Sequence, residues 1–208
     1  MSIIKPRIKN NLTKSKELEI EDNQIVNKEI ENAKFTNLDI YDIEFENMKF
    51  RNVEIGNNKF EKSKFTDILF ENCNFFNTNF ENCIFVRCEF KNCKMTGSSL
   101  TESRLYNVSF VETNANYINL SMTDMENVVF QNIGLRNSNF QENHLKNINF
   151  EKVDLTQAQF FKTSLKNIEL SDSIIEGIAI SIEDIKGVTI NQFQAVDLMY
   201  LIGVKIKL

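Results

Sequence analysis

Apolar residues recur every five positions along most of this chain. Every position divisible by five from Ile20 to Ile190 is apolar, 35 in succession, and the phase never slips. A period of five fits neither the 3.6-residue turn of an α-helix nor the two-residue alternation of a strand. A side chain that returns every fifth residue faces one core only if the backbone turns a corner in each repeat. The pattern therefore predicts a coil with an apolar residue on each side.

A second inward position lies two residues before each central residue. It is mostly apolar or small, as at Ile43 and Cys73, with Asn58 and Asn143 among the few exceptions. Four five-residue sides close a coil of 20 residues, and coils stacked about 4.8 Å apart pair as parallel strands or bridges. Residues 18–190 are therefore predicted to form an all-β, quadrilateral parallel β-helix of about nine coils, roughly 42 Å long.

Residues 20 apart in this solenoid are expected to lie on top of one another. Fifteen of the 18 Phe occupy central positions, where chance would put a fifth of them. Aromatic rings at this spacing can stack with an offset and fill the interior. The predicted core ladder is Phe50, Phe70, Phe90, Phe110, Phe130 and Phe150. Asn columns two residues after the centre, such as Asn107, Asn127, Asn147 and Asn167, are expected to form amide ladders between coils.

The repeat resembles the pentapeptide-repeat family, whose motif A(D/N)LXX has Leu or Phe at its centre. The resemblance covers about residues 18–190. It implies that the quadrilateral β-helix is right-handed. Residues 1–17 are polar and basic, and we expect them to be a lead-in that covers the first coil.

A different pattern follows the repeat over residues 191–208. Asn191 followed by Gln194 resembles a capping box, and Gly203 suits the end of a helix. The predicted helix carries one apolar face, formed by Ala195, Leu198, Met199 and Ile202. Residues 204–208 alternate as a short tail strand. This segment either shields the last coil or packs on a second copy in a homodimer.

The segment GVTINQFQAVDLMYLIGVKI resembles the C-terminal segment of the Qnr and MfpA group of quinolone-resistance pentapeptide proteins. The matching positions are Gly187, Val188, Ile190, Gln194, Ile202, Gly203, Val204 and Ile206. The resemblance implies a homodimer formed through this end. The dimer interface is then expected to include Phe193, Val196, Leu198, Met199, Ile202, Val204 and Ile206.

The same resemblance implies a DNA mimic that binds the type II topoisomerases DNA gyrase and topoisomerase IV. Its effect would be protection against fluoroquinolones, enzyme inhibition, or both. The best-known Qnr proteins interrupt their coils with loops, whereas this chain keeps its register from residue 20 to 190. In this respect it resembles the loop-less MfpA-like members, which leaves inhibition open. The alternative function is a generic structural or interaction solenoid with no topoisomerase partner.

Charge is shared unevenly among the four predicted walls. The chain carries 29 acidic and 24 basic residues, a net charge of −5, which argues against direct nucleic-acid binding through phosphate neutralisation. The wall centred on Ile20 and Ile40 and the wall opposite it are acidic. Carboxylate rows there are either ordinary solvated surface or a mimic that enters a positively charged DNA channel. The candidate contact residues are Asp39, Asp42, Glu61, Glu81, Glu102 and Glu142.

The Cys and His residues do not lie at positions suited to metal binding or catalysis. The four Cys, at 73, 83, 88 and 93, share the inward phase but do not converge as zinc ligands do. Cys73 and Cys93 lie one coil apart, within disulfide reach, although a reducing cytoplasm argues against a bond. His144 is the only His and occupies an outward position. No nucleotide motif, secretory signal or 20-residue apolar span occurs, so the prediction is a cytoplasmic non-enzyme without cofactor, metal or membrane contact.

Overall fold

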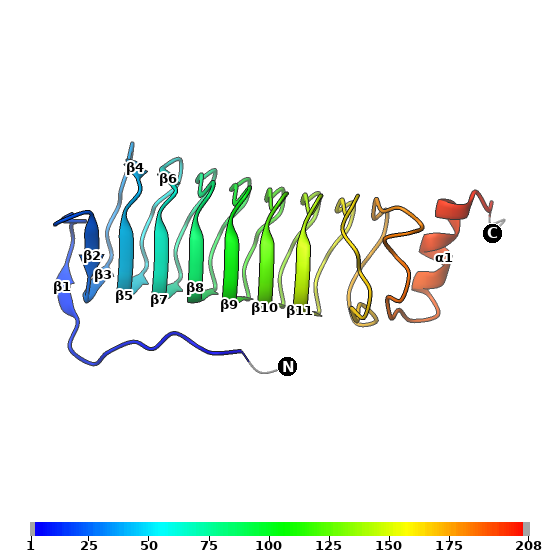
Figure 1. Cartoon of the computed structure of the whole chain (residues 1–208), viewed down its shortest axis with the longest axis horizontal. Coiled ribbons are helices and arrows are strands. Elements are labelled where there is room, and N and C mark those ends of the chain that lie inside the picture. The colour runs from blue at the N-terminus through cyan, green and yellow to red at the C-terminus, as the bar shows by residue number, and fades with distance from the viewer. Residues whose placement is uncertain (1–2, 206–208) are drawn as a thin grey trace.

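Stacked coils form the body of the molecule in the computed structural model, which describes residues 3–205 (Figure 1). Each coil pairs with the next in parallel and at an offset of 20 residues, so Phe45 lies opposite Phe65 and Phe65 opposite Phe85. The strands are β1 (Thr13–Ser15), β2 (Gln24–Val26), β3 (Lys28–Glu31), β4 (Asp39–Tyr41), β5 (Glu44–Arg51), β6 (Lys59–Glu61), β7 (Lys64–Glu71), β8 (Ile84–Lys91), β9 (Arg104–Val111), β10 (Asp124–Gln131) and β11 (His144–Glu151). The predicted parallel β-solenoid is confirmed.

One large sheet covers two adjacent sides of the solenoid. Its order is β1-β3-β5-β7-β8-β9-β10-β11, with β2 also paired to β5, and β5 and β7 to β11 each have eight residues. Strands β4 and β6 pair on another wall. Towards the C-terminus the coils are joined by isolated parallel bridges, such as Asp154 with Ile174 and Glu169 with Thr189. Six coils thus carry a continuous eight-residue strand, and the backbones of the later ones pair through isolated bridges.

The corners of the coils are made by left-handed backbone. Every fifth residue from Asn27 to Asn167 has a positive φ, and Gly97 is the one glycine in this series. Asn and Asp enter this region more readily than other side chains, which explains the abundance of Asn two residues after the centre. Amide ladders form in the Asn52 column, where Asn92 Nδ2 donates to Asn72 Oδ1 at 2.6 Å and Asn72 Nδ2 donates to Asn52 Oδ1 at 3.2 Å. In the predicted column of Asn107, Asn127, Asn147 and Asn167, the described residues show one such bond, from Asn147 Nδ2 to Asn127 Oδ1 at 3.1 Å. Asn therefore both adopts the positive φ of the corner and forms the amide hydrogen bonds between coils.

This corner geometry gives a first testable prediction. Replacing Asn72 (φ 55°) by Val should cost about 1–3 kcal/mol, because a β-branched residue is strained in this conformation. Asn72→Gly should cost less, because Gly adopts positive φ without strain and loses only the amide ladder. Urea unfolding of the two variants measures the difference. Equal losses of unfolding free energy would show that the ladder, and not the backbone, explains Asn at the corners.

Small polar residues at the second inward position donate hydrogen bonds to backbone carbonyls of the preceding coil. Thr78 Oγ1 donates to the carbonyl of Ile55 at 2.8 Å, and Ser98 Oγ donates to that of Phe75 at 2.7 Å. Asn58 donates to the carbonyls of Phe35 and Ile55, both at 2.9 Å. A buried hydroxyl or amide costs free energy unless it is hydrogen-bonded. These bonds explain why Ser, Thr and Asn are accepted beside a Phe-rich core.

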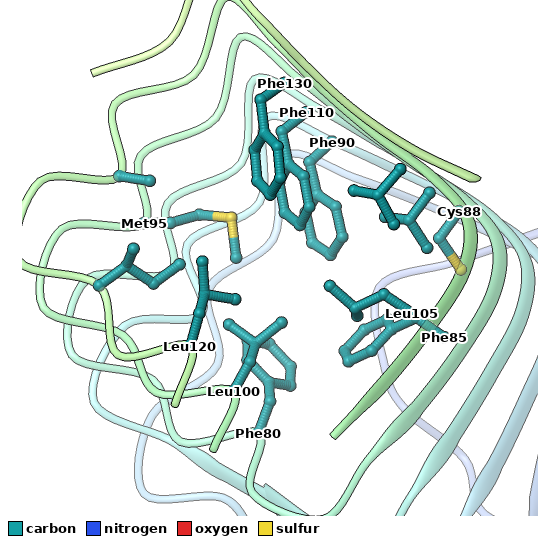
Figure 2. Packing of buried hydrophobic residues seen from close by; sticks show 14 of the residues in the cluster. Phe80, Phe85, Cys88, Phe90, Met95, Leu100, Leu105, Phe110, Leu120 and Phe130 are labelled. Carbon is teal, nitrogen blue, oxygen red and sulfur yellow. The ribbon is translucent and has the colours of Figure 1, made fainter. Parts of the chain in front are cut away.

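Large side chains at the central positions fill the tube. Phe90, Phe110 and Phe130 lie one behind another in Figure 2, with ring centroids 5.0 and 5.2 Å apart and planes within 7°. Phe50, Phe70 and Phe150 continue the same column with separations of 4.7–5.1 Å. The ends are less well covered, because Ile20 is 47% exposed and Ile190 only half-buried. The central position thus faces the core except at the ends of the repeat.

The N-terminal segment extends further than a cover for the first coil. Strand β1 pairs with β3 as an added layer on that coil. Before β1, the chain runs back along the outside of the rod beneath several coils (Figure 1). The backbone N–H of Lys9 donates to Asn47 Oδ1 at 2.8 Å, and that of Ile4 to Asn107 Oδ1 at 3.1 Å. We call residues 3–9 the strap.

A short helix closes the other end. It comprises α1 (Gln194–Leu198) and a 3-10 turn η1 (Met199–Ile202). The capping box is confirmed: the N–H of Asn191 donates to Gln194 Oε1 at 2.7 Å, and the N–H of Gln194 donates to Asn191 Oδ1 at 3.0 Å. Gly203, with φ 75°, ends the helix as predicted.

The inward face of this helix differs from the predicted one. Leu198 and Leu201 pack against the core, whereas Ala195 and Ile202 are exposed. The α-to-3-10 transition changes the spacing, so Leu201 takes the place predicted for Ile202. Val204 and Lys205 are not in a strand, and the remainder of the predicted tail strand, including Ile206, lies outside the described residues.

Candidate partner-binding surfaces

The wall centred on Ile40 and Phe60 carries the acidic row. Glu61 and Glu81 occupy the same position on successive coils, and Asp42, Glu102 and Glu142 share the neighbouring corner column. Asp39, Asp42, Glu102 and Glu142 are exposed, while Glu61 and Glu81 are half-buried. Because successive coils are fixed by backbone pairing, these carboxylates lie at whole multiples of the coil spacing along the rod, with gaps where Lys62, Asn82 and Met122 occupy the corner column.

Two lysines interrupt this row at its two ends. Lys162 Nζ lies 2.8 Å from Glu142 Oε1, so Glu142 is paired. Lys62 Nζ donates to the Tyr41 hydroxyl at 2.7 Å and lies over the Tyr41 ring. Within residues 3–205, no basic nitrogen lies within 4.0 Å of the carboxylates of Asp39, Asp42, Glu61, Glu81 or Glu102. The structure thus leaves five of the six predicted residues as free charges.

The opposite wall is acidic in sequence but largely neutralised at its N-terminal end. The Arg51 guanidinium lies 3.0, 3.4 and 3.2 Å from carboxylate oxygens of Glu29, Glu31 and Glu71. Lys91 Nζ is 3.9 Å from the other oxygen of Glu71. One guanidinium on the middle coil therefore holds together three carboxylates from the coils on either side of it. The 20-residue spacing between Glu31, Arg51 and Glu71 is the sequence signal for this network, whereas charge counted wall by wall does not reveal it.

The Cys and His side chains form no metal centre within the described residues. No group of three or more His, Cys, Asp or Glu side chains there is arranged to hold a metal ion. Cys73, Cys83, Cys88 and Cys93 are free and buried, and their Sγ atoms donate to carbonyls of the preceding coil. Burial raises the pKa of the Cys83 and Cys88 thiols to about 12. His144 is exposed at the start of β11.

The thiols give a second prediction. At pH 8 the native protein should react with an aromatic disulfide reagent at least about 100-fold more slowly than an exposed cysteine, because burial blocks access to all four thiols and the raised pKa of Cys83 and Cys88 leaves little thiolate at those two. All four thiols should react once guanidinium unfolds the chain. Absorbance of the released thiolate measures both rates. Rapid titration of any cysteine in the native protein would contradict the buried assignment.

The C-terminal end exposes an apolar surface. Phe193 is 75% exposed, and Val196, Ile202 and Val204 are 53%, 56% and 45% exposed. Beside them lies a hollow of about 210 Å³ lined by Ile182, Ile185, Val188, Leu198, Met199, Leu201 and Ile202. Of the predicted interface residues, Leu198 packs on the protein's own core, and Ile206 is outside the described residues. None of the described helices has the length and apolar character needed to cross a membrane.

The stacked coils, left-handed corners and five-residue inward period define a pentapeptide-repeat β-helix. The profile of the pentapeptide repeat region matches residues 83–160. The fold is similar to a trypsin-treated variant of QnrB1, a plasmid-mediated fluoroquinolone resistance protein, with 20% identity, a TM-score of 0.57, and coverage of 90% of this chain and 94% of that one.

A second solved structure with this fold has a different role. HetL, from the cyanobacterium Nostoc sp. strain PCC 7120, is a pentapeptide repeat protein involved in heterocyst differentiation regulation. It is 15% identical, with a TM-score of 0.58, over 81% of this chain and 84% of that one. No curated protein matches the chain. The two likenesses establish the fold.

Proposed function

We propose that this protein is a non-catalytic DNA mimic of the cytoplasm that binds type II topoisomerases, DNA gyrase or topoisomerase IV, and changes their sensitivity to fluoroquinolones. The observation that carries the proposal is the row of unpaired carboxylates on one flat wall. Negative charges held on one side of a rigid rod are complementary to a positively charged groove that normally holds a DNA backbone. The fold likeness to QnrB1, a fluoroquinolone resistance protein, supports an effect on fluoroquinolone sensitivity.

Rigidity is the physical advantage of this architecture. Carboxylates on a flexible acidic segment lose conformational entropy when they bind, whereas those on Glu61, Glu81 and Glu102 are already positioned by the coils beneath them. Binding would occupy the DNA-binding groove of the topoisomerase or destabilise a drug-trapped cleavage complex. The modest net charge of −5 places the specificity in the arrangement of the row and not in total charge.

We also propose that the apolar C-terminal end joins two copies. Phe193, Val196 and Ile202 expose large side chains beside an apolar hollow, and such a surface is stable in water when a second copy covers it. Two rods joined end to end would span roughly 80–90 Å, twice the rise expected for nine coils. The contact would be isologous, with the same residues contributed by both copies.

The dimer gives a third prediction. Phe193→Asp should convert the dimer to a monomer at micromolar concentration, because the charge would be buried against apolar side chains. Light scattering coupled to gel filtration measures the mass. Phe161→Asp is the matched control, since Phe161 is also exposed, at 45%, but lies on a side wall. A wild-type protein that is already monomeric would rule out this interface. A dimeric wild type for which the two variants have equal masses would also rule it out.

A gyrase supercoiling and DNA-cleavage assay with a titrated fluoroquinolone tests the proposed function. Adding the protein should shift the drug concentration needed for half-maximal cleavage, or inhibit supercoiling directly. The same assay with topoisomerase IV identifies the preferred enzyme. No change in supercoiling or drug-induced cleavage at any protein concentration, with either enzyme, would end the proposal.

The second candidate is an interaction solenoid with no topoisomerase partner. The likeness to HetL favours it, because that fold matches this chain as well as QnrB1 does. Under this alternative the acidic row is solvated surface. The supercoiling assay separates the two candidates, because only the first requires any response from the topoisomerase.

A further inference from the structure

The strap lies along one edge of the rod, over a column of corner residues. This column consists of Asn27, Asn47, Asp67, Arg87, Asn107, Asn127, Asn147 and Asn167, each 20 residues from the next. All eight have positive φ, so their side chains project from the same corner of successive coils. The strap runs across the coils and opposite to their order, since Lys9 meets Asn47 while Ile4 meets Asn107.

Side-chain oxygens of this column accept the main-chain N–H groups of the strap. The N–H of Lys9 donates to Asn47 Oδ1 at 2.8 Å, and the N–H of Arg7 donates to Asp67 Oδ1 at 2.8 Å. The N–H of Ile4 donates to Asn107 Oδ1 at 3.1 Å. Main-chain donors are common to every extended peptide except at Pro, so this contact recognises an extended backbone and not a particular sequence.

Two residues break the Asn column where the strap crosses it. Arg87 Nε and Nη2 each lie 2.7 Å from an oxygen of Asp67, which fixes the Asp67 carboxylate while Oδ1 receives the strap. Burial alone would raise the pKa of Asp67, but hydrogen bonds from Arg87 and Arg7 outweigh it and hold the pKa below its usual value. The Arg7 side chain adds to this effect, so the site favours a basic segment. Asn47 and Asp67 are buried, at 2% and 7% exposure.

Half-buried and exposed residues alternate along the strap, as they do in an extended peptide bound to a surface. Pro6 and Ile8 are half-buried, while Lys5, Arg7 and Lys9 are exposed. Residues 1–16 contain five of the 24 basic residues and none of the 29 acidic ones, so residues 17–208 carry a net charge of −10. A basic, extended segment is therefore held on an acidic body by backbone contacts and opposite charge.

The edge carries polar side chains that the strap does not contact. Asn147 and Asn167 continue the column beyond Asn107 and are exposed. Thr66, next to Asp67, has a buried hydroxyl without a hydrogen-bond partner among the described residues. A longer segment, or one with an acceptor at Thr66, would therefore make contacts that the strap does not. Such additional contacts are needed, because a tethered segment competes at an effective concentration in the millimolar range.

We propose that this edge is a binding surface for an extended, basic peptide segment of a partner protein, and that the strap covers the edge until such a segment displaces it. The edge recognises main-chain N–H groups through Asn47, Asp67 and Asn107, and basic side chains through Asp67. It lies on a corner away from the row of Glu61 and Glu81, so the inference does not depend on topoisomerase binding.

The test converts the strap into a separate peptide. A protease site is inserted between Asn10 and Asn11 of the full-length chain, the purified protein is cut, and the released segment is removed by gel filtration. A fluorescein-labelled peptide of residues 1–10 is then titrated and followed by anisotropy. We expect it to bind the cut protein and to bind the intact protein at least about tenfold more weakly, because the tethered strap competes.

Two matched variants locate the binding. Asn47→Gly and Asn147→Gly both keep a residue that adopts positive φ, but only the first removes an oxygen that holds the strap. Cut Asn47→Gly should bind the peptide at least about tenfold more weakly than cut Asn147→Gly, with unchanged circular dichroism in both. The proposal fails if no cut protein binds the peptide, if intact and cut proteins bind it equally, or if the two Gly variants bind alike.

Discussion

Phe110→Ala should destabilise the protein by about 3–5 kcal/mol, the usual range for truncating a buried aromatic residue. Phe110 is 1% exposed, and its ring lies parallel to those of Phe90 and Phe130 at 5.0 and 5.2 Å. The cavity left by the ring cannot readily close. Strand β9 is paired in register with both β8 and β10, so a shift of its backbone would break ladders on both sides. The cost is therefore expected near the top of the range.

Urea unfolding followed by circular dichroism measures this loss. Phe76→Ala is the control, because Phe76 is 37% exposed and contacts Lys94 on the outer surface. Its substitution should cost less than about 1 kcal/mol. If the two variants lost similar free energy, the stacked column would not be the main source of cohesion, and hydrogen bonding between coils would have to account for most of the stability.

Reversing three charges on the acidic row should weaken topoisomerase binding at least about tenfold. The triple variant Glu61→Lys, Glu81→Lys and Glu102→Lys replaces attraction by repulsion along the wall, and the loss should shrink as salt screens the interaction. Anisotropy titration of gyrase at two ionic strengths measures both effects. None of these three carboxylates has an ion-pair partner among the described side chains, so the substitutions break no salt bridge there.

An equal change in net charge on the opposite wall provides the control. The variant Glu89→Lys, Glu112→Lys and Glu151→Lys carries the same number of new positive charges but leaves the Glu61 row intact. It should retain most of the affinity. If the control lost as much as the first variant, total charge would govern binding. If neither changed, another surface would make the contact.

The periodic part of the molecule was predictable because one constraint repeats. A strict five-residue period admits few backbone paths, and 20-residue stacking follows from four equal sides. The Phe50 to Phe150 column and the amide ladders could therefore be placed from residue numbers alone. The capping box of Asn191 and Gln194 was predictable for a similar reason, since its spacing is fixed by helix geometry.

The non-periodic contacts were not predictable. The strap is held by main-chain donors, which every residue except Pro has, so its sequence gives no sign of where it binds. Asn at the corners predicts ladders without revealing the backbone conformation, because a ladder and a positive φ favour the same residue. The pairing of Arg51 with three glutamates depends on side-chain rotamers as well as on columns. The inward face of α1 differs from the predicted one because the change to a 3-10 turn has no clear sequence signal.

The register of the repeat also fixes how this protein can change in length. Removal of 20 residues would delete one coil, about 4.8 Å of the rod, and leave every remaining column aligned. Removal of five would keep all inward positions filled but rotate everything downstream by a quarter turn. The carboxylates of Glu61 and Glu81 would then no longer share a face with those that follow. Interior packing is therefore preserved by any deletion of a multiple of five residues, whereas the surface pattern is preserved only by a deletion of a multiple of 20.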